Sequence, residues 1–294
     1  MSTSIVKKWQ LLAFGSLALG LAACKKDGNP NRLPSVSPDA YVGTIDGYRS
    51  SDDVFPQHLI AYWGFDNNTN EQFSNAAPTT SLNASLADGG VRGKSLRLDS
   101  GFLYYATQLP KFNSDSLRSF TISAWVKIAN NGSRRTMLMQ VARPNMFWGN
   151  INFNLNTNSN PPSVTNIFRF QPTFMTQSGG LQDNLNTVLS PTIGRDKWTH
   201  LVLTYDISTG VFQNYADGVR VGNFPNRGTT NTFFCHVPNE LIIGANYNVI
   251  PGRAVNTDAT FGRMNGEVDE IRVWNRPLGE AFVRALFNLG RANK

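Results

Sequence analysis

The residues from Arg143 to Asn152 combine aromatic rings with side chains that form hydrogen bonds. An aromatic face stacks on the C–H groups of a sugar ring, while amide and guanidinium groups bond its hydroxyls. Trp148 lies at a predicted loop-to-strand transition and is the tryptophan most expected to be exposed. The candidate ligand-binding residues are Trp148, Phe147, Asn145, Asn150 and Arg143. The alternative is that the two aromatic rings pack at a sheet edge.

Arg134 and Arg135, which follow the polar loop 130–133, form a second candidate for ligand contact. Two adjacent guanidinium groups could meet acidic groups of a partner. The alternative is a solvated loop tip, where exposed charges contribute little.

Cys235 and His236 are adjacent, which raises the question of a Cys/His nucleophile or a zinc site. Both need further groups, and neither a second Cys nor a close second His accompanies the pair. Cys235 lies in the apolar run 232–237, so a buried, inert thiol is expected. We also find no nucleophile elbow, phosphate-binding glycine loop or His-rich metal motif.

The N-terminus has the pattern of a secretory signal. Lys7 and Lys8 precede an apolar segment, residues 11–23, that ends in small residues before Cys24. This segment is shorter than the roughly 20 residues that cross a bilayer as a helix. We therefore expect a signal peptide over residues 1–23.

The ending Leu21-Ala22-Ala23-Cys24 resembles the lipobox of bacterial lipoproteins. The resemblance implies cleavage before Cys24 and attachment of lipid to its sulfur, which would tether the protein by acyl chains. Lys25, where an Asp would favour the inner membrane, implies the outer membrane, and the charged run 25–27 implies exposure at the cell surface. The alternative is an ordinary signal peptide with a chance Cys. With Cys24 lipidated, no disulfide can form within the chain.

The charge of the chain is mildly basic. The formal net charge is +7, of which Lys7 and Lys8 contribute two, so +5 remains after cleavage of the signal. The charges are dispersed, which favours anionic surfaces or acidic glycans over specific nucleic-acid binding. The alternative is a charge that serves solubility alone.

Residues 24–57 are rich in Asp, Asn, Pro and Ser and are predicted to form a flexible tether. From residue 58 to 294 the dominant period is two, which indicates many short strands. Residues 120–128 alternate most clearly, and 215–221 predict a hairpin with an Asp-Gly turn. A helix is expected only near the end, over 277–286. The fold class predicted is all-β: a two-sheet antiparallel sandwich with a short C-terminal helix.

Five segments in order resemble the laminin-G-like, concanavalin A-type jelly rolls of the lectin/glucanase group: 62–66, 93–98, 120–126, 198–218 and 265–278. The resemblance spans about 59–289 and implies two antiparallel sheets packed face to face. Three tryptophans in strand patterns are expected to fill the gap between the sheets: Trp63, Trp125 and Trp198.

The resemblance also implies a structural calcium ion near the rim of the sandwich. Asp66 and Asp269 match the acidic positions on the first and last strands, and calcium prefers such oxygen ligands. The alternative for Asp66 is a turn cap. Glucanases of this fold carry a further carboxylate beyond a Glu-x-Asp pair. Here Glu267 and Asp269 would share a face, but the positions for the third carboxylate hold Ile271 and Arg272. Glu270 would point to the opposite face if the strand is regular, so catalysis is not expected.

These observations predict a lipid-anchored, cell-surface module that binds carbohydrate without catalysis. The alternative from another class is a structural or adhesion protein with a protein partner. A minor alternative is a glycoside hydrolase.

Overall fold

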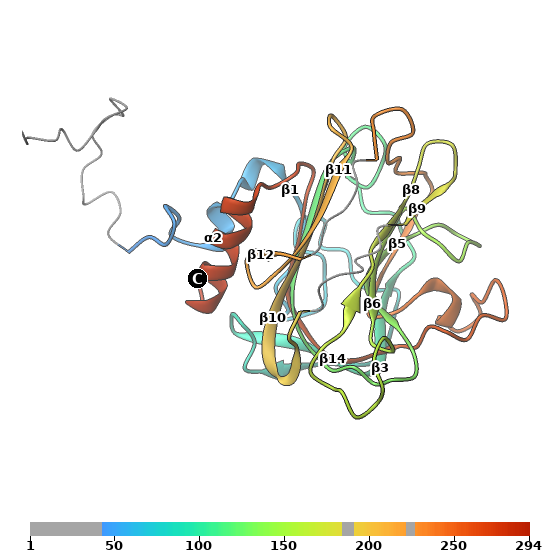
Figure 1. Ribbon diagram of the computed structural model, residues 1–294, viewed down its shortest axis with the longest axis horizontal. Coiled ribbons are helices and arrows are strands. Elements are labelled where there is room, and N and C mark those ends of the chain that lie inside the picture. Colours follow the sequence, from blue (N-terminus) through green and yellow to red (C-terminus); the bar gives the residue numbers. More distant parts are fainter. Residues whose placement is uncertain (1–42, 184–190, 222–226) are drawn as a thin grey trace, which may run out of the picture. The chain divides into compact units, whose positions relative to one another are not determined.

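The alternation of apolar and polar residues produces strands throughout the described part of the chain. The computed structural model describes residues 43–183, 191–221 and 227–294 (Figure 1). In β4 (Phe120–Ile128) the alternate residues predicted to share one face are all buried in the core: Phe120, Ile122, Ala124, Val126 and Ile128. The fold class and this strand are therefore confirmed.

The described residues form fourteen strands, three 3-10 helices and a C-terminal α-helix. Their bounds are β1 (Leu59–Trp63), β2 (Thr80–Asp88), β3 (Lys94–Tyr105), β4 (Phe120–Ile128), β5 (Thr136–Ala142), β6 (Ile151–Asn156), β7 (Arg169–Phe170), β8 (Thr173–Met175), β9 (Leu181–Asp183), β10 (Gly194–Asp206), β11 (Val211–Ala216), β12 (Val219–Arg220), β13 (Glu240–Ile243), β14 (Met264–Trp274), η2 (Ser51–Asp53), η3 (Pro56–His58), η4 (Tyr247–Val249) and α2 (Glu280–Arg291).

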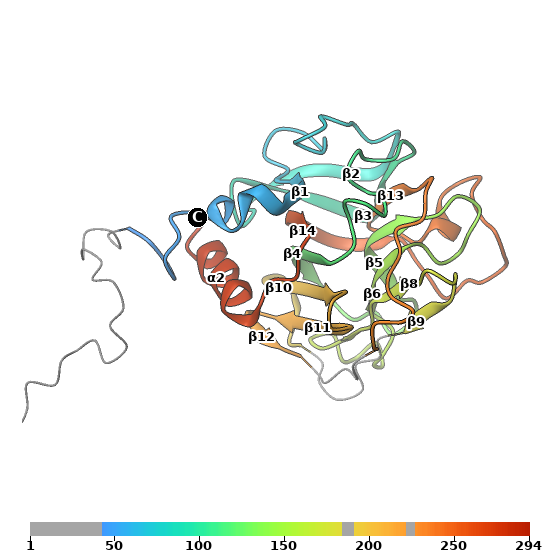
Figure 2. The same ribbon diagram turned by 90° about the horizontal axis from the view of Figure 1, so that it is seen from above.

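The strands form one antiparallel sheet in the order β12-β11-β10-β4-β14-β3-β13-β5-β6-β8-β9, with β1 on β14, β2 on β3 and β7 on β6. The sheet curls so that its two halves face each other (Figure 2). The predicted hairpin joins β11 to β12, and Asp217 and Gly218 have the positive φ values of 50° and 77° that its turn requires.

The largest apolar cluster fills the space between the two halves of the sheet. Trp63 is 0% exposed there, and its Nε1 donates a hydrogen bond to the Tyr105 hydroxyl at 3.0 Å. A buried indole N–H needs such a partner. The prediction that Trp63 packs between the sheets is confirmed.

Trp125 lies on the other face of β4, beneath α2. Its ring stacks on Phe287 with centroids 5.7 Å apart, and a Cβ at Gly290 would lie 2.4 Å from the indole. The expectation that Trp125 fills the gap between the sheets is wrong, because its position alternates with the core residues Ala124 and Val126. Trp198 is half-buried, outside that core, and its Nε1 donates to the Gly89 carbonyl at 3.1 Å.

Residues 43–58 form a strap that packs on the domain. Val54 is 1% exposed, and its carbonyl accepts a hydrogen bond from Trp274 Nε1 at 2.9 Å. Ser51 Oγ donates to the carbonyl of Lys294, beyond α2, at 2.6 Å. The packed domain thus begins before residue 58, where the sequence predicted its start. The few apolar residues that anchor the strap lie in a segment whose overall composition is polar, so composition did not reveal them. Cys24, the predicted signal and the tether up to residue 42 lie outside the described residues. Among the described residues, no helix has the length and apolar character to cross a membrane.

We expect a protein that begins at residue 58 to be less stable than one that begins at residue 43. The shorter protein loses the buried Val54 side chain and the bonds that the strap makes to Trp274 and Lys294. Its free energy of unfolding should be lower by about 2 kcal/mol or more, measured by urea denaturation with circular dichroism. Equal midpoints for the two proteins would contradict the structural role of the strap.

Candidate functional site

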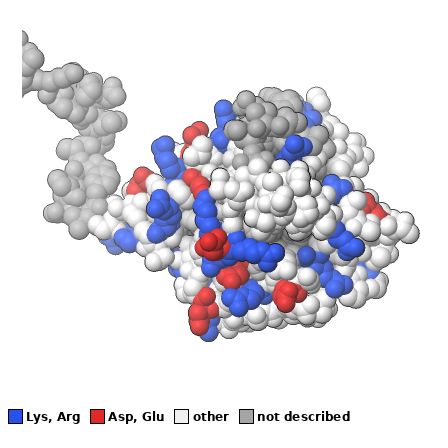
Figure 3. All heavy atoms as spheres, turned by 60° about the horizontal axis from the view of Figure 1, so that its bottom comes forward, with Lys and Arg blue, Asp and Glu red and all other residues white. Residues whose placement is uncertain are grey.

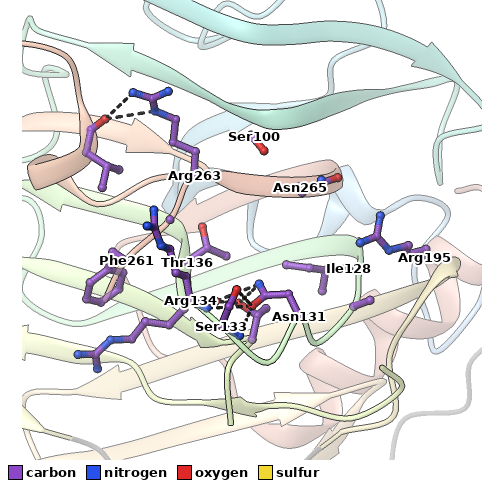
Figure 4. A pocket seen from close by; sticks show the side chains of 15 residues that line it. Ser100, Ile128, Asn131, Ser133, Arg134, Thr136, Arg195, Phe261, Arg263 and Asn265 are labelled. Atoms are coloured by element: carbon purple, nitrogen blue, oxygen red, sulfur yellow. Dashed lines mark hydrogen bonds between the residues drawn. The ribbon is translucent and has the colours of Figure 1, made fainter. Parts of the chain in front are cut away.

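A cavity of about 570 Å³ opens where the ends of several strands meet (Figure 4). The register of the sheet brings them together, because Ile128 at the end of β4 pairs with Gly194 of β10 and with Gly266 of β14. The residues next to these glycines, Arg195 and Asn265, therefore reach the same end of β4. We call this cavity the arginine pocket, and its charged lining consists of Arg134, Arg135, Arg195 and Arg263.

Asn131 holds the loop that carries Arg134. Its Oδ1 accepts the backbone N–H groups of Ser133 at 2.8 Å and of Arg134 at 2.9 Å. Its Nδ2 donates to the Arg134 carbonyl at 3.0 Å and to Thr157 Oγ1 at 3.2 Å. Asn is favoured in such turns because its short side chain can replace a backbone partner. The turn therefore fixes the backbone from which Arg134 lines the pocket.

Two other arginines are oriented by neutral groups. The guanidinium carbon of Arg135 lies 4.5 Å from the centre of the Phe261 ring, and its Nη2 donates to Thr260 Oγ1 at 3.2 Å. Arg263 Nε and Nη2 both donate to the Val249 carbonyl at 3.2 Å, as the dashed lines in Figure 4 show. These contacts fix the guanidinium groups without neutralising them.

The arginine pocket is strongly basic, although Asp258, outside its lining, interacts electrostatically with Arg135. No Asp or Glu lines it in the described ranges of the chain, and none of its four arginines forms a salt bridge there. Arg92, Arg97 and Arg272, by contrast, each pair with a carboxylate. Figure 3 shows basic side chains spread over the face toward the lower end of Figure 1, with acidic ones beside only some of them. The pocket therefore suits an anionic or strongly polar ligand.

An aromatic cluster adjoins the pocket and consists of Phe147, Trp148 and Phe261. The ring centroids lie 5.0 Å apart for Phe147 and Trp148, 5.6 Å for Phe147 and Phe261, and 5.8 Å for Trp148 and Phe261, all edge to face. Phe261 also lines the arginine pocket, while Phe147 and Trp148 are half-buried. Two of the predicted ligand-binding residues thus lie beside the pocket.

The other three predicted ligand-binding residues are placed differently. Asn150 is 0% exposed, its Nδ2 donates to the His236 carbonyl at 2.8 Å, and its Oδ1 accepts the His236 N–H at 3.1 Å. We correct its assignment, because a buried amide bonded on both sides braces the fold and cannot reach a ligand. Asn145 is exposed with a φ of 61°, and its N–H donates to the Tyr247 hydroxyl at 3.2 Å. Arg143 is half-buried on the same loop.

A second cavity, of about 440 Å³, lies beside α2. Its lining includes Trp198 and Lys197, with Trp125 beneath. The Lys127 ammonium group sits 4.5 Å from the centre of the Trp198 ring, and Lys197 pairs with Asp217 at 3.1 Å. The aromatic face and the charge are therefore already engaged within the protein.

A family model described as the concanavalin A-like lectin/glucanases superfamily matches residues 103–284, more than half of the chain. The chain belongs to this superfamily. This family assignment confirms the resemblance that the five sequence segments indicate. A search of curated proteins finds no match.

The chain is also similar to several solved structures at low sequence identity. Domain 4 of AbnA, an extracellular arabinanase from Geobacillus stearothermophilus solved with arabinotriose, is 21% identical, with a TM-score of 0.48 over 78% of this chain and 97% of that chain. The Trypanosoma rangeli sialidase solved with 2,3-difluorosialic acid is 16% identical, with a TM-score of 0.50 over 80% and 33%. The binding domain of botulinum neurotoxin DC, solved with rat synaptotagmin II, is 13% identical, with a TM-score of 0.51 over 80% and 52%. The chain thus spans about half of the neurotoxin chain and a third of the sialidase.

Asp66 and Asp269, the predicted calcium ligands, both hold the loop between β2 and β3. Asp66 Oδ1 accepts the Lys94 N–H at 3.0 Å, and Asp269 Oδ2 accepts those of Val91 at 2.6 Å and Arg92 at 3.2 Å. The strands β1 and β14 pair, as the family resemblance implies. Calcium needs several oxygen ligands, whereas these carboxylates face N–H donors. Within the described ranges, no group of three or more His, Cys, Asp or Glu side chains is placed to hold a metal ion. The hydrogen bonds of Asp66 and Asp269 do not fit a calcium site. Calcium binding therefore rests on the sequence prediction alone.

A bulge in β14 changes the expected direction of Glu270. Val268 and Ile271 both enter the core, so Asp269 and Glu270 both face outward between them. The register against β4 shifts at this point, and Glu270 has a φ of 53°. Two residues then occupy the space of one, as in a β-bulge. The prediction that Glu270 points to the opposite face assumed a regular strand. The strand has a bulge at this position, so the prediction does not apply.

Glu270 enters a buried ion network rather than a catalytic pair. It pairs with Arg272 and with Arg92, and its Oε1 accepts a hydrogen bond from the Tyr62 hydroxyl at 2.6 Å. Burial raises the pKa of Asp269 to about 8, and the adjacent Glu270 carboxylate adds to the effect, while backbone N–H donors oppose it. The carboxylates of this strand are thus committed to structural contacts.

The sequence analysis did not identify the other two arginines of the pocket or its aromatic residue: Arg195, Arg263 and Phe261. Arg195 is the second residue of β10, and the other two lie just before β14, so none belongs to a motif with fixed spacing. Only the pairing of β4 with both β10 and β14 brings them to the loop of Arg134. That loop was the one sequence signal for the pocket.

The raised pKa of Asp269 predicts a pH-dependent stability. A carboxyl group whose folded pKa exceeds its unfolded value of 3.8 contributes stability that is full below pH 3.8 and is lost as pH rises through about 8. The free energy of unfolding should therefore fall between pH 5 and pH 9. In Asp269→Asn the slope over this range should be smaller.

Urea denaturation at several pH values measures this effect, with Asp99→Asn, an exposed carboxylate on β3, as the control. An unchanged slope in Asp269→Asn would contradict the assignment. A midpoint raised by added calcium in the wild-type protein, and not in Asp269→Asn, would instead support the sequence prediction of a metal site.

Proposed function

We propose that this protein is a non-catalytic carbohydrate-binding module, tethered by lipid on Cys24 to the outer membrane and exposed at the cell surface. The observation that carries the proposal is that Phe261 belongs both to the arginine pocket and to the aromatic cluster. Aromatic rings and a dense set of hydrogen-bond donors therefore meet at one place.

The chemistry of this place suits a saccharide. Guanidinium, amide and hydroxyl groups line the pocket and can bond sugar hydroxyls, and they include Asn131, Ser133, Thr136 and Asn265. The half-buried ring of Trp148 offers an apolar surface for the C–H face of a sugar ring. Binding sites of this kind combine an apolar wall with a few placed polar groups.

Two contacts support a role without catalysis. Glu267, the other carboxylate of the Glu-x-Asp pair, is ion-paired with Arg97 at 3.0 Å and Lys127 at 3.3 Å. Ser123 Oγ and His200 Nε2 lie 2.8 Å apart, but both residues are buried, and burial lowers the pKa of His200 to about 3. A histidine that neither titrates near neutral pH nor meets solvent is a poor general base.

A protein partner is the competing function. One fold neighbour binds synaptotagmin II and another is a sialidase, so both ligand classes occur with this architecture. The large exposed apolar side chains of the described residues are dispersed among different loops and strands: Phe73, Met146, Leu181, Val219, Val237 and Val255. Such dispersion favours a glycan over a flat apolar protein interface.

Trp148→Ala should weaken glycan binding while leaving the fold intact. Loss of one aromatic stacking contact costs about 1 kcal/mol, or about fivefold in Kd. A glycan array with residues 43–294 selects the ligand, calorimetry measures Kd, and circular dichroism checks the fold. Phe73→Ala, which removes a ring that is 60% exposed, is the matched control and should bind like the wild type. Equal loss in the two variants, or an array without any bound glycan, would contradict the proposal.

A further inference from the structure

We propose that the arginine pocket selects acidic saccharides, whose carboxylate or sulfate groups pair with arginines of its lining: Arg134, Arg135, Arg195 and Arg263. This inference rests on the proposed carbohydrate-binding function and deepens it by naming the class of ligand. It requires that the pocket carry positive charge without carboxylate partners, that part of this charge be held in a fixed orientation, and that sugar-binding groups surround it.

The pocket gathers four arginines in the lining of one cavity. In the described parts of the chain, its four arginines lack ion pairs, whereas Arg97 and Arg272 have carboxylate partners. A shallow hollow beside the pocket shares Arg195 with it and contains Asp99 and Glu267. Glu267 is already paired with Arg97 and Lys127, so it does not neutralise the pocket. An anionic ligand would supply the missing countercharge.

Two of the four guanidinium groups, those of Arg135 and Arg263, are held in place before any ligand binds. Arg263 uses Nε and Nη2 on one carbonyl, Val249, which leaves Nη1 without an acceptor among the contacts described. Arg135 lies over the Phe261 ring and uses Nη2 on Thr260, while its buried Nε has no partner. A planar guanidinium matches the two oxygens of a carboxylate or sulfate, and its prior orientation reduces the entropy lost on binding.

The surroundings favour an acidic sugar over a free inorganic anion. The pocket, at about 570 Å³, is far larger than a single oxyanion needs. Its remaining polar groups are amides and hydroxyls, including Asn131 and Ser133 on one side and Ser100 and Asn265 on the other (Figure 4). These groups match the hydroxyls of a sugar that brings the anion into the pocket.

The test uses four probes and two double variants of the protein covering residues 43–294. Oligogalacturonate and its methyl ester differ in carboxylate charge, and carrageenan oligosaccharide and its desulfated form differ in sulfate charge. Arg134→Gln with Arg195→Gln removes two exposed pocket charges whose guanidinium groups form no hydrogen bond or salt bridge among the contacts described. Arg220→Gln with Arg284→Gln removes two exposed charges on β12 and α2 and is the control of equal net charge.

We expect at least one acidic probe to bind at least tenfold more tightly than its neutral form. The pocket variant should lose at least tenfold for that probe, and the control less than threefold, in calorimetry at 0.15 M salt. The arm that responds distinguishes carboxylate from sulfate recognition.

Two outcomes would overturn the inference: neutral forms that bind as tightly as the acidic ones, or equal losses in the pocket and control variants. The first leaves carbohydrate binding intact, because neutral glycans still bind. Failure of every acidic probe also overturns the inference, and failure of the neutral glycans of the array as well overturns the proposed function.

Discussion

The pairing of β14 along its length is the constraint on which most of this structure depends. Its first half pairs with β3, its second half with β1, and most of its length with β4. This last strand therefore lies in the middle of the sheet and fixes the positions of β1, β3 and β4 beside it. Because β10 pairs with the other side of β4, the same register also brings the start of β10 to the start of β14. The arginine pocket is a consequence of that register.

The bulge in β14 links the core to the strap at the N-terminal end of the domain. By turning both Asp269 and Glu270 outward, it creates a buried patch of charge that needs partners. Arg272 and Arg92 supply them, and Asp52 of η2 extends the network by accepting a hydrogen bond from Arg272 Nη2 at 2.7 Å. The strap thus covers groups that would be costly to bury unpaired. Its packing against Trp274 then connects it to the apolar surface beneath α2.

The strands and turns were predictable because the sequence patterns that specify them involve residues close together in the chain. The alternation in 120–128 and the Asp-Gly turn of Asp217 and Gly218 each depend on neighbours in sequence, and both are confirmed. The errors arise where the sequence does not mark direction or distance. Trp125 is a large aromatic residue of the kind expected in the core, yet it lies on the outer face of the sheet, where Phe287 of α2 covers it. The bulge at Glu270 inserts one extra residue into β14, and no Gly, Pro or Asn in the bulge marks it in the sequence.

The candidate site was only partly predictable for the same reason. Phe147 and Trp148 form an obvious aromatic pair, but Asn150, two residues on, turns inward to bond His236. The pocket beside them is assembled from segments that lie far apart in the chain. Its two adjacent arginines, Arg134 and Arg135, were visible in the sequence as a charged pair, whereas Arg195 and Arg263 joined them only through the strand pairing of β4.

The most direct test of the central claim is an NMR titration of residues 43–294 with the tightest-binding oligosaccharide, following the tryptophan indole and arginine Nε resonances. If the arginine pocket is the binding site, the resonances of Trp148 and of the pocket arginines should shift, and that of Trp198 should not. Shifts at Trp198 and Arg291, beside α2, with Trp148 and the pocket arginines unchanged, would place the ligand in the other cavity and contradict the account.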